Sequence, residues 1–166
     1  KGLEDIIHAL KILNRRELKL LVIGAEPDHP YTGYLASVGR DKVILLPPGP
    51  FRELPEWLAM ADLVALPSRP EKRSSGQIPA KLVDAMAMGK PIIATGVGAV
   101  AEVAGDAALI IPPGDVQILA ESIAQIINDE AFAAGLGEKA RRKCLESYSI
   151  KIMSERLKDL IDTLVK

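Results

Sequence analysis

The segment that runs from Leu66 to Thr95 combines residue types and spacings suited to binding a phosphate-bearing ligand. A short apolar run at 62–66 has the composition of a buried strand, and it is followed by a basic loop that also contains serine and glycine. Pro79 favours the start of a helix after this loop, and Gly89 favours its end. The N-terminus of a helix placed in this way presents free backbone N–H groups and a positive field to an anion. This part of the chain is therefore predicted to hold phosphate groups.

Two sets of residues in this segment fit the parts of a nucleotide. Phosphate oxygens would be met by the loop and by the first turn of the helix, through Ser74, Ser75, Gly76, Gln77 and Lys81. Asp84, further along the same helix, could accept hydrogen bonds from the hydroxyls of a ribose. Together these residues indicate a nucleotide or a nucleotide-sugar as the ligand.

Each set also has a plainer interpretation. The basic residues of the loop, Arg69, Lys72 and Arg73, could belong to an ordinary solvated surface. Asp84 could form an ion pair with Lys81, three residues before it, which would contribute ~0.2–0.5 kcal/mol. The position of the loop after a strand raises the weight of the functional interpretation, because ligands of open α/β sheets bind at the carboxyl ends of the strands.

Length and composition are those of one globular domain. The 166 residues are 48% hydrophobic and 26% charged, with a net charge of −1, so the balance of charge gives no reason to expect nucleic acid as a partner. Cys144 is the only cysteine, which excludes an internal disulfide and a multi-cysteine metal site. No apolar run approaches the ~20 residues of a membrane span. We expect a single domain over 1–166 in a cytoplasmic setting.

Apolar runs that suit strands alternate along the chain with helical periods. Strands are expected at 18–23, 43–46, 62–66, 91–95 and 107–111, and helices at 3–13, 31–39, 54–60, 79–88, from Asp115 onward, at 131–146 and over 150–166, with a short turn at 99–104. Strands with few polar positions, separated by helices, predict a parallel sheet covered on both faces. The expected fold class is α/β, a Rossmann-like doubly wound parallel sheet.

The order of elements departs from such a fold in one respect. The chain opens on a helix, whereas a doubly wound domain begins with a strand that becomes central in the sheet. We therefore expect the sequence to be a piece of a larger protein, with the first strand located upstream of Lys1.

Six short segments, taken in order, carry a resemblance to a known family. They are Lys1-Gly2 followed by Leu3, Ile6 and Ala9; Leu21-Val22-Ile23-Gly24; Ala61-Asp62 through Pro67-Ser68; Asp84 through Thr95; Gly98 through Glu102; and Ile111-Pro112-Pro113-Gly114-Asp115. Their pattern resembles the C-terminal, donor-binding domain of family-four retaining GT-B glycosyltransferases (glycosyl transferases group 1). Each segment alone is weak evidence for the family, but the six segments in the same order make the resemblance specific.

The resemblance implies an enzyme that moves a sugar from a nucleotide diphosphate-sugar to an acceptor with retention. Lys1 takes the position of a catalytic lysine that contacts the diphosphate, and Gly24 would end a strand facing the same cleft. The negative charge that grows on the leaving diphosphate would be met by cationic and N–H donors, so neither a metal nor a cofactor is expected. The family's two acids, spaced E-x7-E, fall on Gly76 and Asp84. This chain therefore lacks the first acid, for which Glu71 is a weak substitute.

The resemblance also implies partners. A UDP-, GDP- or ADP-linked sugar would be the donor, and an N-terminal domain that this chain lacks would bind the acceptor and could bring peripheral contact with a membrane. The chain alone should bind donor without transferring sugar. A non-catalytic nucleotide-binding or interaction module and a nucleotide-sugar epimerase of the same architecture remain alternatives. The segment 85–91, which follows the acid, favours the transferase.

Overall fold

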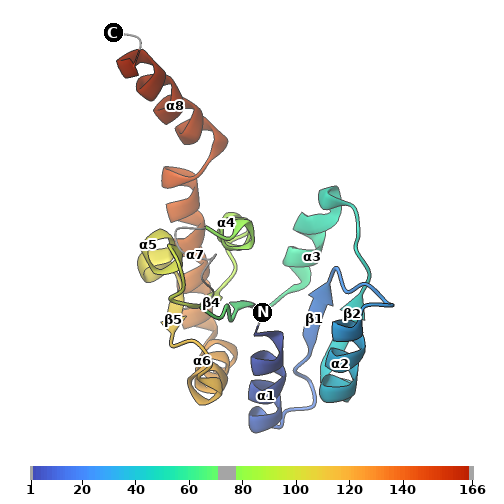
Figure 1. The fold of residues 1–166 in the computed structure, drawn as a ribbon. Coiled ribbons are helices and arrows are strands. Elements are labelled where there is room, and N and C mark those ends of the chain that lie inside the picture. The colour runs from blue at the N-terminus through green and yellow to red at the C-terminus, as the bar shows by residue number, and fades with distance from the viewer. Residues whose placement is uncertain (1, 71–77, 165–166) are drawn as a thin grey trace.

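The computed structural model describes residues 2–70 and 78–164, and within these ranges it contains five strands and eight α-helices (Figure 1). The strands are β1 (Leu20–Ile23), β2 (Val43–Leu46), β3 (Val64–Leu66), β4 (Ile92–Thr95) and β5 (Leu109–Ile111). The helices are α1 (Leu3–Leu13), α2 (Pro30–Gly39), α3 (Leu54–Met60), α4 (Ala80–Ala87), α5 (Val100–Ala104), α6 (Val116–Asn128), α7 (Glu130–Ser147) and α8 (Ile150–Leu164).

All strand pairs in the described part of the chain are parallel, as the sequence predicted. β1 pairs with β2 in a register that places Leu20 opposite Val43. β3, β4 and β5 follow one another in a second sheet, with Ala65 opposite Ile93 and Ile93 opposite Leu109. The described strands thus hydrogen-bond as two parallel sheets, of two and three strands, rather than as one.

Strand β4 shows why both faces of the larger sheet are covered. Successive side chains of a strand point to opposite faces, and all four residues of β4 are buried. Ile93 packs into a cluster formed with α1 and α6, whereas Ile92 and Ala94 pack into a second cluster formed with α4, α5 and α7. An apolar strand without alternation is the pattern expected of a sheet enclosed on both faces.

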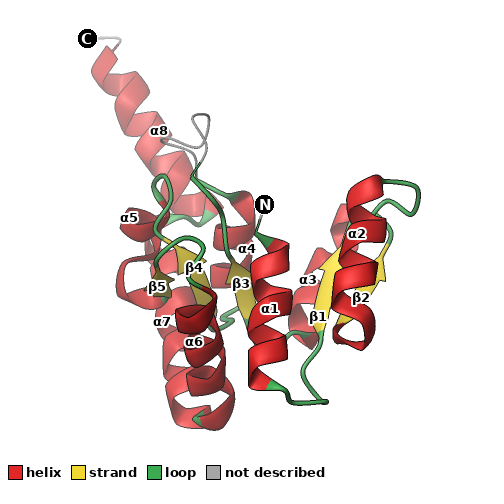
Figure 2. Ribbon diagram, turned by 60° about the horizontal axis from the view of Figure 1, so that its bottom comes forward, coloured by secondary structure: helices red, strands yellow, loops and turns green. Residues whose placement is uncertain are grey.

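Helix α1 connects the two sheets. Its buried residues Ile6, Ala9 and Leu10 share one cluster with Leu20 of β1 and Ala65 of β3. Figure 2 shows α1 between β3 and β1 in the projection. The helix leads into β1 and begins beside the carboxyl end of β3, which is where ligand sites form in open α/β sheets.

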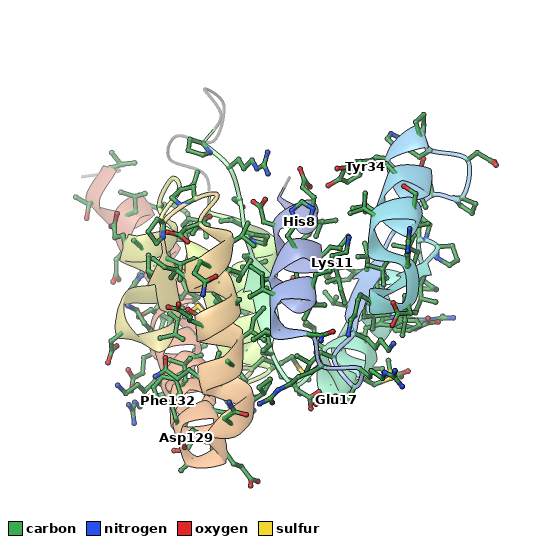
Figure 3. The ribbon with its side chains drawn as sticks, turned by 90° about the horizontal axis from the view of Figure 1, so that it is seen from below. His8, Lys11, Glu17, Tyr34, Asp129 and Phe132 are labelled. Carbon is green, nitrogen blue, oxygen red and sulfur yellow. The ribbon has the colours of Figure 1, made fainter. Side chains whose placement is uncertain are left out.

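Two helices begin at capping aspartates, and one segment differs from its predicted structure. Asp115 and Asp129 cap α6 and α7, accepting hydrogen bonds from the backbone of Ile118 at 2.9 Å and Phe132 at 2.8 Å. The segment predicted as a short turn at 99–104 is instead α5, because its alanine-rich sequence favours a helix that Gly98 merely precedes. Figure 3 shows Asp129 and Phe132 at the junction of α6 and α7.

Helix α8 extends away from the other elements (Figure 1). It has no buried residue, and all of its apolar side chains except that of Ile152 are exposed. None of the helices in residues 2–70 and 78–164 combines the length and hydropathy of a membrane span.

Candidate functional site

The start of α1 and the end of β3 touch through backbone atoms. Gly2, which precedes α1, is buried and has a φ of 80°, a conformation that glycine adopts without strain. A Cβ added to Gly2 would overlap the carbonyl oxygen of Pro67, which follows β3. The Lys1-Gly2 pair singled out in the sequence therefore has a structural reason for its glycine.

An ion pair reinforces the same contact. Arg69 donates to Asp5 through two nitrogens, with Nη2 at 2.7 Å from Oδ1 and Nε at 3.4 Å from Oδ2. Nη2 also lies 3.5 Å from Oε1 of Glu4. The Asp5 side chain is only 7% exposed, so the fork of the guanidinium supplies the partner that a buried carboxylate needs.

Tyr31 joins this cluster from α2. Its hydroxyl donates to Oε2 of Glu4 at 2.6 Å. This hydrogen bond is the main reason that the pKa of Glu4 is lowered. Burial, followed by the same hydrogen bond, raises the pKa of Tyr31 well above its ordinary value. The contact therefore joins an ionised Glu4 to a neutral phenol at neutral pH.

Thr95 holds the segment after β3 from the other side. Its side chain is almost fully buried at the end of β4, and its hydroxyl donates to the carbonyl oxygen of Ser68 at 2.6 Å. Residues 67–69 are thus fixed by α1 on one side and by β4 on the other. This stem leads into the loop in which the sequence placed its phosphate ligands.

The predicted site residues are only partly described by the structure. Lys1, Glu71, Lys72, Arg73, Ser74, Ser75, Gly76 and Gln77 lie outside the described residues. Gly24 directly follows β1 with a φ of 86°, and a Cβ there would have no atom within 4 Å, so the space beside it is open. Lys81 is exposed in the first turn of α4. Asp84 lies one turn further on and is half-buried.

The structure does not support the plainer interpretations of Asp84 and Arg69. Lys81 and Asp84 are both described, and the structure contains no ion pair between them. Burial alone raises the pKa of Asp84. Arg69 is not a free cation of a solvated loop, because it is paired with the acids of α1. Asp5 was missed, although one signal was present: it lies next to Ile6 and four residues before Ala9, on the apolar side of the helix.

Among the described residues, no group of three or more His, Cys, Asp or Glu side chains is placed to hold a metal ion. The site that the structure does describe consists of the carboxyl ends of β1 and β3 and the N-terminal turns of α1 and α4. Lys81 and Asp84 are the described side chains at this edge that the sequence predicted as ligand contacts.

The sequence profile of the protein family described as "Glycosyl transferases group 1" matches residues 1–129. This match covers more than half of the 166 residues. The chain belongs to the glycosyl transferases group 1 family. The resemblance drawn from six sequence segments is confirmed.

Curated relatives of this group 1 chain are longer than it is. N-acetyl-alpha-D-glucosaminyl L-malate synthase of Bacillus anthracis is 35% identical over 163 residues, which cover 93% of this chain and 40% of that protein. MMP alpha-(1->4)-mannosyltransferase of Mycolicibacterium hassiacum is 32% identical over 155 residues, which cover 90% of this chain and 36% of that protein. The chain thus spans well under half the length of these two relatives.

Solved structures share the fold. Sucrose-phosphate synthase of Thermosynechococcus elongatus gives a TM-score of 0.84 at 23% identity, with 99% of this chain and 42% of that chain covered. Anabaena HepE in complex with UDP gives a TM-score of 0.83 at 22% identity, with 98% of this chain and 45% of that chain covered. The C-terminal domain of a glycosyl transferase group 1 protein of Francisella tularensis gives a TM-score of 0.73 at 23% identity, with 90% of this chain and 80% of that chain covered. The expected fold, a Rossmann-like C-terminal half of a GT-B glycosyltransferase, is confirmed.

The close approach of Gly2 to Pro67 leads to a stability prediction. Gly2→Ala should lower the free energy of unfolding by roughly 2 kcal/mol or more, because alanine is strained at this φ and its Cβ would displace the Pro67 carbonyl. Gly33→Ala is the matched control, since Gly33 lies in α2 with open space around it and should gain up to about 1 kcal/mol. Urea denaturation of both variants measures the difference. Equal stabilities would contradict the contact.

The hydrogen bond between Tyr31 and Glu4 leads to a pH prediction. Because the pKa of Glu4 is lowered in the folded chain, its contribution is present above the range where free glutamate titrates, roughly pH 4–5, and is lost as pH falls through the lowered pKa. Tyr31→Phe should cost about 1 kcal/mol at pH 7, and less as the pH falls below that range.

Urea denaturation across pH 3–7 on the wild type and the variant checks this difference. Tyr34→Phe is the control, since the Tyr34 ring stacks on Tyr31 with a centroid distance of 6.1 Å and its side chain is exposed. A cost for Tyr31→Phe that does not change with pH would rule out the charged hydrogen bond.

Proposed function

We propose that this chain is the donor-binding domain of a retaining glycosyltransferase, which holds a nucleotide diphosphate-sugar at the carboxyl ends of β1 and β3. The observation that carries the proposal is the contact of Gly2 with Pro67, which brings the N-terminus of α1 against the segment that enters α4. The first turn of α1 then lies beside the carboxyl end of β3, and the N-terminus of a helix favours an anion. Family membership and the name of one relative, a mannosyltransferase, support the same activity.

In this proposal the parts of the donor are divided between the two helices. Lys1, directly before Gly2, contacts the diphosphate and stabilises the charge that develops on it as the glycosidic bond breaks. The loop residues Ser74–Gln77 and Lys81 contact the same phosphates. The open space beside Gly24 leaves room for the ligand at the end of β1.

Asp84 is proposed to bind the ribose. Its carboxylate is partly desolvated and, among the described residues, has no ion-pair partner, and this burial raises the pKa of Asp84. Two ribose hydroxyls would supply the hydrogen bonds that burial removes, and nucleotide binding should therefore lower the pKa of Asp84. The base of the donor is proposed to be uracil, guanine or adenine, and the fold is shared with a protein solved in complex with UDP.

The acceptor site is proposed to lie on a second domain of a longer protein. The chain spans 40% of one relative and 36% of another, so most of each of those proteins has no counterpart here. Transfer with retention also requires an acceptor hydroxyl held against the anomeric carbon while the diphosphate is clamped. This chain would offer the clamp, and the second domain would offer the opposing wall.

Nucleotide binding to this chain tests the donor site. UDP, GDP or ADP should bind more tightly than the matching monophosphate, and the nucleoside should bind hardly at all, with a difference that shrinks as salt rises. Asp84→Ala should weaken diphosphate binding by on the order of 1.5–3 kcal/mol, typical of hydrogen bonds to a charged group. Asp62→Ala, which removes an exposed aspartate just before β3, is the control. Calorimetry that gives one affinity for nucleoside, monophosphate and diphosphate would refute the phosphate site.

Sugar transfer tests the division into two halves. With a panel of UDP-, GDP- and ADP-sugars, this chain alone should bind donor without releasing or transferring sugar. The longer protein that contains it should transfer sugar and keep the anomeric configuration of the donor, which NMR of the product reads directly. Robust transfer by the chain alone would refute the half-enzyme proposal. A folded longer protein that is inactive with every donor would favour a binding module.

A further inference from the structure

The first residues of the chain present an electrostatic conflict at the proposed phosphate site. One lysine, Lys1, is followed by two carboxylates, Glu4 and Asp5, so the side chains of residues 1–5 sum to one negative charge. Acids in the first turn stabilise a helix because they oppose the positive end of its dipole. The same acids would repel the diphosphate that the start of α1 is proposed to bind.

Arg69 is placed to remove this conflict. Its guanidinium contacts Asp5 through Nη2 and Nε and reaches Glu4 through Nη2. With Arg69 included, the side-chain charges of residues 1–5 sum to zero, although Arg69 is 64 residues away from Asp5 in sequence. His8 and Lys11 are exposed on α1 and do not pair with these acids in the described structure (Figure 3).

The acids that Arg69 contacts are largely buried, so their charges are less screened by water than charges on an open surface. The side chains of Asp5 and Glu4 are 7% and 19% exposed, so the field of an unneutralised carboxylate would be screened less by water than on an open surface. The Arg69 side chain is half exposed, at 49%, and lies on the segment that follows β3. Two of its nitrogens, Nη2 and Nε, contact Asp5, so its positive charge is placed to act on these acids.

We propose that Arg69 is a positioning and charge-compensating residue of the donor site, which preserves the preference of the start of α1 for a diphosphate by reducing the summed charge of Asp5 and Glu4 from −2 to −1. The inference rests on the proposed donor-binding function. It predicts that the diphosphate preference depends on the net charge of this cluster and not on the presence of an arginine as such.

The test uses this chain and measures the affinities of UDP, GDP and ADP and of their monophosphates at low salt. Arg69→Gln should weaken diphosphate binding by about tenfold and monophosphate binding by less. Arg69→Lys, which keeps the charge, should stay within about threefold of the wild type, and molar salt should largely abolish the effect of Arg69→Gln. Lys139→Gln, which breaks the exposed pair of Lys139 with Asp106 at 3.1 Å on α7, is the control and should bind like the wild type.

The decisive variants remove the negative charge of Asp5. Asp5→Asn alone should bind diphosphate at least as tightly as the wild type, and adding Asp5→Asn to Arg69→Gln should restore affinity to within about threefold of the wild type. A double variant that stays as weak as Arg69→Gln would show that Arg69 contacts the phosphates itself, and would overturn the inference. Unfolding midpoints report whether each variant is folded. If Arg69→Gln does not fold, a loss of diphosphate binding in folded Asp5→Asn still overturns the inference.

The outcomes separate the two proposals. A wild-type chain that binds no nucleotide diphosphate overturns the donor site and this inference together. A wild-type chain that prefers diphosphate, with Arg69→Gln showing the same preference at low salt, overturns the role of Arg69 and leaves the donor site intact.

Discussion

The contact between the start of α1 and the segment after β3 is the constraint on which the described site depends. Gly2 lies against the Pro67 carbonyl, and Arg69 joins the buried Asp5 two residues further along. These contacts link segments that are more than sixty residues apart in sequence. They fix the first turn of α1 against the end of β3, whereas the packing of Ile6, Ala9 and Leu10 holds the rest of the helix against the larger sheet and α6.

The sequence predicted regular elements well because their signals are local. The helical period at 3–13 and the apolar run at 43–46 agree with the bounds of α1 and β2, since each is defined by its own residues. The helix α5 was missed because the turn signal of Gly98 outweighed five residues of alanine-rich sequence. Parallel pairing followed from the alternation of elements, but the separation of the described strands into two sheets did not.

The site was predicted less completely, because its contacts join distant parts of the chain. Asp84 was identified from its motif, its partial burial fits a ligand-facing acid, and the alternative of an ion pair with Lys81 is not seen. Arg69 was noticed as a cation of the loop, and nothing in its neighbourhood indicated that a carboxylate of α1 would bind it. Most of the predicted phosphate ligands lie outside the described residues, so their roles stay predictions.

The arrangement of the strands has a practical consequence for handling the protein. In the described part of the chain, β1 and β3 each have a hydrogen-bonded neighbour on one side only. Open strand edges are templates for pairing with other molecules, and the exposed apolar side chains of α8 form a second surface that favours association. The edges are short, at four and three residues, which limits this pairing. Self-association at high concentration is thus a property to monitor in solution work on this chain, by light scattering or sedimentation, before any affinity is interpreted.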